Sequence, residues 1–315
     1  PPTPERVERV LGGTRRDPDE VVGLIAPAWG KATVRQIAVN SVMAGCGPEH
    51  LPIVITAVEA MIEPEFNLGG VQATTNAAAP LAIVNGPLAL QLDFNFGPNV
   101  FGQGWRANAV VGRAVRLILL NVGGGQPGTV DKSSFGQPGK YSFCISENEA
   151  DSPWESLRAE RGFGLDDTTV TVAGVAGPHT VIVMGSLNGE ETLMTIARAM
   201  TAAGNNLVFM DNVDPVVAVT PEYADIVARD GFSKAEVKRF LWEHAVLPLS
   251  AYYSGQREIA ERWKPRNLFE RNGEPWIRMV ERPEDTVFLV AGKHGKHATF
   301  CPSFDSRSVT KRVGR

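Results

Sequence analysis

The sequence predicts an α/β protein in which mixed or mostly parallel sheets are flanked by helices. Segments with strand character alternate with segments whose apolar residues have helical spacing, and this alternation is typical of α/β folds. The chain has 315 residues, of which 43% are hydrophobic, so it can bury a large core. Short motifs recur along the chain, and this recurrence predicts two pseudo-duplicated lobes.

The individual elements follow from composition and periodicity. Expected strands are residues 36–43, 70–75, 81–85, 168–173, 180–184, 206–210, 215–219 and 286–290. Expected helices are residues 48–62, 105–120, 189–203, 221–229 and 233–244. Ser233-Lys-Ala-Glu236 has the pattern of a capping box, in which the serine and glutamate side chains satisfy free backbone N–H groups at a helix start.

Two stretches rich in glycine, proline and polar residues separate these elements. Residues 123–139 and 147–167 are predicted to be long loops, and loops of that length in a compact domain are usually functional or mobile. We expect the lobes to divide after the second loop. Residues 1–165 then form an N-terminal lobe that contains Cys46, and residues 166–315 form a C-terminal lobe with the His179 and His297 turns.

Composition narrows the class of partner. A net charge of −4 gives no electrostatic reason to expect nucleic acid or an anionic membrane. Three widely separated cysteines do not form a disulfide framework, so we expect a cytoplasmic protein. No apolar stretch reaches the ~18 residues that a membrane span needs, and the N-terminus does not resemble a signal peptide.

Cys46 is the main candidate for a reactive group. Residues 36–43 have the composition of a strand and Pro48 suits the first turn of a helix, so Cys46 is expected at the positive end of a helix dipole. That position favours a thiolate, and Glu49 and His50 would lie close enough to shuttle protons. Cys46 should then react with iodoacetamide before the other two cysteines do. A small buried hydrophobic residue in a tight turn is the alternative.

A Gly-x-x-Gly turn followed by a ring residue occurs before Tyr141, His179 and His297. If these turns are equivalent, the three rings should approach one shared region at the edge of a sheet, and they are candidate catalytic groups. A second repeat pairs Cys46-Gly-Pro-Glu-His50 with Val219-Thr-Pro-Glu-Tyr223. The alternative is that Gly-x-x-Gly is common turn chemistry.

Further polar residues are candidates for substrate binding. Arg106 and Asn108 stand at a helix start, where a guanidinium and backbone N–H groups could hold a carboxylate or phosphate, although surface capping is the alternative. Lys140 and Lys296 stand beside ring residues in the glycine turns. Residues 123–128 follow a helix, which favours a helix C-terminus over a phosphate loop. No spacing of metal ligands is present, and no cofactor is implied.

Six motifs along the chain belong together. They are Val42-Met-Ala-Gly-Cys46-Gly-Pro-Glu-His50, Gly70-Val-Gln-Ala-Thr-Thr75, Ile83-Val-Asn-Gly-Pro87, Phe101-Gly-Gln-Gly-Trp105-Arg-Ala-Asn108, Gly136-Gln-Pro-Gly-Lys140-Tyr-Ser-Phe and Glu147-Asn-Glu-Ala-Asp-Ser-Pro-Trp154-Glu. Together they resemble the large region that accompanies the small UGSC (seleno)protein domain. The UGSC domain is similar to the selenocysteine subunit of glycine and related reductases, and its redox motif, Cys or selenocysteine followed by Gly-Ser-Cys, is absent from this chain.

The resemblance implies a redox role shared with a small UGSC-like partner. The family pattern has His-Pro-Cys after Thr-Thr, whereas Asn76-Ala-Ala follows Thr75 here. Asn76 is therefore a candidate for substrate binding, and Cys46 is left as the main thiol.

Three functions stay open at this point. The first is a thiol-dependent oxidoreductase or sulfur transferase that acts on a small polar or carboxylated substrate, with a small redox partner protein. The second is a cofactor-free lyase or hydrolase that uses the ring residues and Lys140 or Lys296. The third is a non-catalytic scaffold subunit of a two-component redox system. Because a resolving thiol is missing, we expect a homo- or hetero-oligomer.

Overall fold

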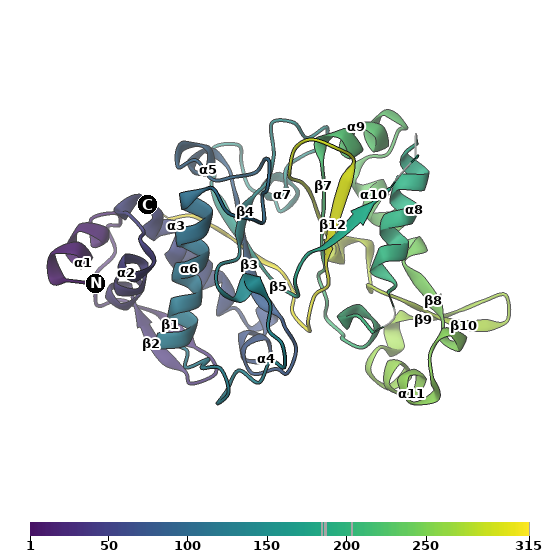
Figure 1. Ribbon diagram of the computed structural model, residues 1–315, viewed down its shortest axis with the longest axis horizontal. Coiled ribbons are helices and arrows are strands. Elements are labelled where there is room, and N and C mark those ends of the chain that lie inside the picture. Colours follow the sequence, from purple (N-terminus) through teal and green to yellow (C-terminus); the bar gives the residue numbers. More distant parts are fainter. Residues whose placement is uncertain (184, 186–187, 203, 315) are drawn as a thin grey trace.

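A computed structural model of the chain describes residues 1–183, 185, 188–202 and 204–314. Two sheets pack face to face, and helices cover the outer face of each, so that the order of layers is helix, sheet, sheet, helix (Figure 1). The expected α/β fold with mixed sheets and flanking helices is confirmed.

Each sheet has a parallel pair of strands on one side and antiparallel strands on the other. The first sheet has the order β13-β5-β3-β4, and β3 is parallel to β4 and antiparallel to β5. Its strands are β3 (Ala79–Asn85), β4 (Cys144–Ser146), β5 (Thr169–Val175) and β13 (Val309–Arg312). The second sheet has the order β11-β7-β12-β6, with strands β6 (His179–Ile182), β7 (Val216–Val219), β11 (Val287–Val290) and β12 (His297–Cys301).

The two sheets repeat one topology. In the first sheet, β3 is parallel to β4 and antiparallel to β5, and β5 is antiparallel to β13. The second sheet has the same pattern: β7 is parallel to β11 and antiparallel to β12, and β12 is antiparallel to β6. The edge strands are exchanged, because β6 follows β5 in the chain but joins the second sheet, and β13 follows β12 but joins the first. The expected division after residue 165 is therefore wrong for the sheets, since both β5 and β13 complete the first.

Alternation along each strand builds three core layers. Leu81 and Ile83 of β3 pack between the sheets against Ala218 of β7, whereas Ala82 and Val84 face the helices of the first lobe. Successive side chains of a strand point to opposite faces, so strands covered on both sides are apolar throughout. All seven residues of β3 are buried.

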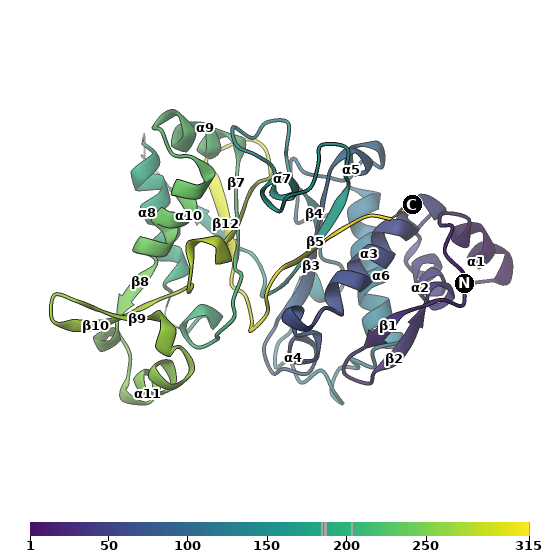
Figure 2. The ribbon, with the colours of Figure 1, turned by 180° about the vertical axis from the view of Figure 1, so that it is seen from behind.

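The helices form the two outer layers and cap the ends of the sandwich (Figure 2). Helices α3 (Leu51–Met61) and α6 (Arg106–Asn121) pack on the first sheet, α2 (Val34–Ala44) packs on these two helices, and α1 (Pro4–Leu11) packs on α2. Helix α8 (Gly189–Met200) packs on the second sheet, α9 (Pro221–Arg229) and α10 (Lys234–His244) pack on α8, and α11 (Ser254–Trp263) joins the same apolar core through Ala260. Short helices lie in the connections, namely α4 (Leu68–Gln72), α5 (Pro87–Gln91) and α7 (Leu157–Glu160).

Two small sheets lie outside the sandwich. One is the hairpin of β1 (Val21–Ile25) and β2 (Gly30–Thr33), next to the helices of the first lobe (Figure 1). The other has the order β8-β10-β9, with strands β8 (Val246–Pro248), β9 (Leu268–Arg271) and β10 (Glu274–Arg278). In the part of the chain that the structure describes, no helix combines the length and apolar character that crossing a membrane requires.

Several expected elements are confirmed with small changes at their ends. The strands predicted at 81–85, 168–173, 215–219 and 286–290 are present as β3, β5, β7 and β11, and the helices predicted at 105–120, 221–229 and 233–244 are present as α6, α9 and α10. The helix expected at 48–62 begins with a 3-10 turn at Pro48–His50 and continues as α3. The strand predicted at 180–184 and the helix predicted at 189–203 correspond to β6 and α8. Their last predicted residues, 184 and 203, lie outside the described residues.

Three predicted strands are wrong. Residues 36–43 belong to helix α2, because Thr33 and Gln36 form a capping box and Gly45, with φ of 92°, ends the helix in the left-handed region. Residues 70–75 include part of helix α4, and residues 206–210 contain a 3-10 turn. In each case the apolar run favours a strand, whereas side chains that cap the helix start and the local turn geometry favour a helix or a 3-10 turn.

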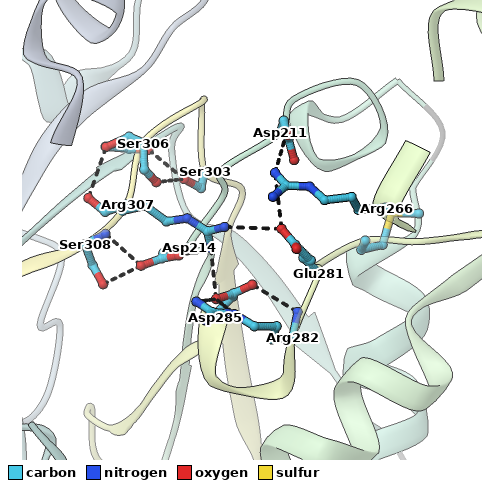
Figure 3. Close-up of polar contacts among 12 residues, drawn as sticks. Asp211, Asp214, Arg266, Glu281, Arg282, Asp285, Ser303, Ser306, Arg307 and Ser308 are labelled. Atoms are coloured by element: carbon cyan, nitrogen blue, oxygen red, sulfur yellow. Dashed lines mark hydrogen bonds and ion pairs between the residues drawn. The ribbon is translucent and has the colours of Figure 1, made fainter. Parts of the chain in front are cut away.

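Arg307 anchors the segment that returns the chain from β12 to β13 (Figure 3). Its Nη1 lies 2.9 Å from Oδ1 of Asp214 and 2.9 Å from Oδ1 of Asp285, which directly precede β7 and β11. The backbone N–H and hydroxyl of Ser308 both donate to Asp214 Oδ2 at 2.7 Å. The Arg307 N–H donates to the carbonyl of Glu65 near the first sheet. The exchanged strand is thus tied to both lobes.

Candidate active site

The two parallel strand pairs end at the same end of the sandwich. Asn148, just past β4, donates its N–H to the Val290 carbonyl in β11 at 2.8 Å. Gly292, just past β11, donates to the Phe96 carbonyl at 2.8 Å, so the loop after α5 lies between the two pairs. Helices α5 and α9, which follow β3 and β7, also lie at this end (Figure 1). Open α/β sheets bind ligands outside the carboxyl ends of their strands, so this end is the candidate active site.

On the first sheet, a buried polar network follows the ends of β3 and β4. Asn85 Nδ2 donates to Glu147 at 2.5 Å and to Glu149 at 3.1 Å. Glu147 also accepts the Leu157 N–H at 2.8 Å, and Glu149 pairs with Arg158 at 2.8 Å. Glu147, Glu149 and Arg158 line a small cavity of about 180 Å³. The Oδ1 atom of Asn85 is buried and has no hydrogen-bond donor among the described residues.

Burial dominates the electrostatics of this network. It raises the pKa of Glu147 to about 7, although Lys234 and the hydrogen bonds from Leu157 and Asn85 lower it in part. Because Glu149 is held by Arg158 and Asn85, its pKa lies below the ordinary value. Near neutral pH the two carboxyl groups therefore differ in charge, and the difference arises from environment rather than from residue type.

We expect Glu147 to make stability depend on pH between about 4.5 and 7. The folded protein keeps the Glu147 proton up to pH 7 whereas the unfolded chain loses it near pH 4.5, so stability falls as the pH rises through this window, by up to about 1.4 kcal/mol per unit. Urea unfolding of wild type and Glu147→Gln across pH 4–8 measures it. The free energy of unfolding of the variant should depend less steeply on pH between 4.5 and 7 than that of wild type. Equal slopes for the two proteins would contradict the raised pKa of Glu147.

On the second sheet, a larger pocket opens beside the glycine turn that precedes β12. We call it the strand-end pocket. It has a volume of about 520 Å³ and an apolar floor that includes Ala218, Ala291 and Phe101. Its polar lining comes from four separate segments and consists of Asn99, Thr180, Thr220, Lys293, His294, His297 and Thr299.

Backbone conformation holds this turn in place. Gly292, His294 and Gly295 all have positive φ, at 85°, 64° and 84°. Such angles favour glycine, and two of the three residues are glycines. The Thr220 hydroxyl donates to the Gly295 carbonyl at 2.8 Å, and Glu222 accepts the Gly295 N–H at 2.9 Å. The end of β7 therefore positions the turn that carries His294 and His297 into the pocket.

The three ring residues do not share one region, so that prediction is wrong. His297 lines the strand-end pocket. His179 is exposed and pairs with Phe300 of β12, so the two side chains lie on the same face of the sheet, the one that the helices cover. His297 is three residues before Phe300 on the same strand, and alternation along the strand therefore puts it on the opposite face from His179. Tyr141 is 74% exposed and lines a different pocket together with Lys140. The three turns precede β4, β6 and β12, which hold non-equivalent places in the two sheets.

Cys46 does not lie at the junction of a strand and a helix. It follows the C-terminus of α2, is 5% exposed, and directs its Sγ to the Val110 carbonyl at 3.5 Å. Burial raises the pKa of Cys46 to about 12, and the nearby Arg106 lowers it only in part. The expected low thiol pKa is therefore wrong, because desolvation opposes the charged form more strongly than local dipoles favour it.

We expect none of the three cysteines to react rapidly in the native protein. Cys46, Cys144 and Cys301 are free and buried, and burial raises the pKa of each thiol. Iodoacetamide labelling at pH 7.5, followed site by site by mass spectrometry, should be far slower than in urea. Rapid labelling of native Cys46 alone would contradict this and restore the thiolate prediction.

The other predicted site residues near Cys46 have structural contacts. His50 is buried, its Nδ1 accepts the Gly47 N–H at 3.1 Å, and burial lowers its pKa. Glu49 is exposed, with an oxygen 3.2 Å from the same imidazole nitrogen. Arg106 donates to the Gly45 carbonyl at 2.9 Å and so caps α2. These residues lie in the helical layer outside the first sheet, where Glu49 lines a pocket with Pro87 and Leu88 just past β3, and none of them is among the residues that line the strand-end pocket.

The remaining predicted binding residues are also separated. Asn108 is buried, and its amide bonds to the backbone of Asn95 and to the Cys144 carbonyl. Asn76 forms reciprocal amide contacts with Asn206 of the other lobe. Lys140 pairs with Asp131 at 2.7 Å. Lys296 is exposed and is not among the residues that line the strand-end pocket.

Sequence reasoning missed several polar groups at the strand ends. Asn85 is the last residue of β3, and Glu147 and Thr220 directly follow β4 and β7, so a position at a strand end was the available signal. Lys293 and His294 were visible beside the predicted His297 turn. No family model matches the chain, and no curated protein matches it either.

Proposed function

We propose that the protein is an enzyme that performs acid–base chemistry, of the lyase or hydrolase kind, on a small negatively charged polar molecule bound in the strand-end pocket. The observation that carries the proposal is the convergence of two imidazoles, an ammonium group and threonine hydroxyls on one concave surface with an apolar floor. Pockets that combine an apolar lining with a few placed polar groups are typical ligand sites.

Each group has a role that its chemistry supports. An imidazole ring carries both a proton donor and a proton acceptor, so His297 and His294 are suited to take and return a proton. The Lys293 ammonium supplies positive charge for a substrate carboxylate or phosphate. The hydroxyls of Thr180 and Thr299 can orient the polar part of the substrate, because a hydroxyl donates and accepts hydrogen bonds.

Redox or sulfur-transfer chemistry at Cys46 is less well supported. Such chemistry needs a thiolate that can reach its substrate, and the burial of Cys46 opposes both requirements. From the UGSC resemblance and the free cysteines we retain as proposals a cytoplasmic location and association with itself or with a small UGSC-like protein. Light scattering after size-exclusion chromatography, with and without such a protein, tests the association.

Histidine NMR tests ligand binding at the pocket. The chain has five histidines, and His179 is an internal control because it lies on the opposite face of the same sheet. Titration with acetate, glycolate and succinate should shift the imidazole Cε1–H signals of His294 and His297 and leave that of His179 in place. If none of these anions shifts either pocket histidine, the proposal fails as stated.

A matched pair of variants tests catalysis. Once a substrate has been found among small carboxylates and their esters, His297→Gln should lower kcat by about 10²–10⁴, the usual contribution of a general acid or base. His179→Gln should leave kcat unchanged. Equal activity of the two variants would remove His297 from the mechanism.

A further inference from the structure

A second pocket lies under the glycine-rich loop of the first lobe, away from the strand ends. We call it the basic pocket. It has a volume of about 710 Å³ and lies between helix α6 and residues 127–141. Arg113 and Arg116, three positions apart on one face of α6, line its wall, and Lys140 lines the opposite side. Neither the strand-end pocket nor the proposed acid–base chemistry uses these residues.

The charges in this pocket do not balance. Among the described residues, Asp131 supplies the only carboxylate that lines it, and this carboxylate already forms an ion pair with Lys140 at 2.7 Å. Arg116 is 6% exposed, and its guanidinium donates to the neutral Gln72 amide oxygen at 3.1 Å. In the described part of the chain neither Arg113 nor Arg116 forms an ion pair, which leaves two positive charges without partners on one wall.

An unpaired guanidinium is costly to bury, so a largely buried arginine in a pocket wall needs a strong reason. Burial lowers the pKa of Arg116, and Arg113 lowers it further, whereas the Asp131 carboxylate raises it. A bound anion would supply the missing charge and accept the free N–H groups. Guanidinium groups match the geometry of phosphate and carboxylate oxygens, and two of them on adjacent turns can reach one doubly charged group.

The rim of the pocket adds a preference for the uncharged part of the ligand. Phe135 is fully exposed, at 100%, and Tyr141 is 74% exposed, and both belong to the pocket lining. Exposed large rings beside a charged cavity can pack on a planar group that the cavity itself does not enclose. Gly128 and Gly136, with φ of 81° and 66°, shape the loop that presents Phe135.

We infer that the basic pocket binds a phosphate monoester of a small aromatic or planar molecule, with its phosphate on Arg113 and Arg116 and its ring against Phe135 and Tyr141. Two unpaired positive charges on one wall match the dianionic charge of a phosphate monoester. A dicarboxylate spreads the same charge over two separated groups and matches the wall less closely. The ligand site is distinct from the strand-end pocket.

Calorimetry with phenyl phosphate, inorganic phosphate and succinate tests the inference. Phenyl phosphate should bind more tightly than either of the others. Arg113→Gln should weaken phenyl phosphate binding by about tenfold or more, as the loss of a charged hydrogen bond does. Arg106→Gln on the same helix, whose guanidinium caps α2 outside the pocket, is the matched control and should leave affinity unchanged.

A second variant separates the two parts of the site. Phe135→Ala removes a fully exposed ring, so it should not impair folding, and it should weaken phenyl phosphate binding without changing the affinity for inorganic phosphate. Absence of phosphate binding at millimolar concentration, an affinity that Arg113→Gln does not change, or tighter binding of succinate would each overturn the inference.

Discussion

Replacing Arg307 with methionine is expected to lower the free energy of unfolding by about 3–5 kcal/mol, the usual cost of breaking a buried ion pair from one side. Asp214 and Asp285 are 5% and 3% exposed, and Arg307 pairs with both, whereas Asp285 also pairs with Arg282 (Figure 3). The methionine side chain fills part of the space but leaves the buried Asp214 carboxylate without its ion-pair partner, and Asp285 keeps only its pair with Arg282 among the described residues. Urea unfolding at pH 7 measures the loss.

Arg312 provides the matched control for this experiment. It lies on β13 a few residues further along, is 66% exposed, and faces Asp167 at 3.4 Å. Exposed pairs of this kind contribute at most about 1 kcal/mol, so Arg312→Met should change stability by less than that. If Arg307→Met costs no more than Arg312→Met, Arg307 does not anchor the exchanged strand.

Lys264 is expected to make the protein more stable as the pH rises above 7. Its side chain is 1% exposed, and its Nζ donates to the carbonyls of Leu207 and Met279 at 2.6 and 2.9 Å. Burial lowers its pKa from 10.5 to about 7. Below pH 7 the ammonium is charged in both states and its burial penalty is constant. Between pH 7 and 10.5 the folded state holds fewer protons than the unfolded state, so stability increases by up to about 1.4 kcal/mol per unit.

Lys264→Met isolates this contribution. Unfolding free energies of wild type and variant between pH 6 and 10 should diverge in slope, because the variant has no group that titrates at this site. Lys31→Met, at an exposed position in β2, should retain the wild-type slope. Parallel curves for wild type and Lys264→Met would show that the buried lysine keeps its ordinary pKa.

Local sequence was sufficient for elements whose signals agree. Helix α10 begins at its predicted capping box, with Ser233 accepting the Glu236 N–H, and α9 spans the predicted Pro221–Arg229. Strands β3, β7 and β11 were predictable because they are continuous apolar runs with clear ends. By contrast, α2 also contains an apolar run, and its capping box at Thr33 was the overlooked signal.

The candidate sites were less predictable than the elements. Of the predicted rings, His297 alone lines the strand-end pocket, because one step of strand alternation puts His179 on the other face. Cys46 had the right neighbours for reactivity in sequence, yet packing against α6 buried it and raised its thiol pKa. A pKa depends on desolvation and on nearby charges, which come from residues far away in the chain.

The sequence by itself determined the α/β class, the alternation of helices with apolar strands and the positions of the best-capped helices, because these depend on contacts between near neighbours. Only the tertiary structure decided that β6 and β13 are exchanged between the two sheets, that the parallel pairs end together, and that Arg113 and Arg116 lack carboxylate partners in the described residues. These features depend on which distant segments pack together. Strand pairing and burial determine these features, and the periodicity of the sequence specifies neither the pairing nor the burial.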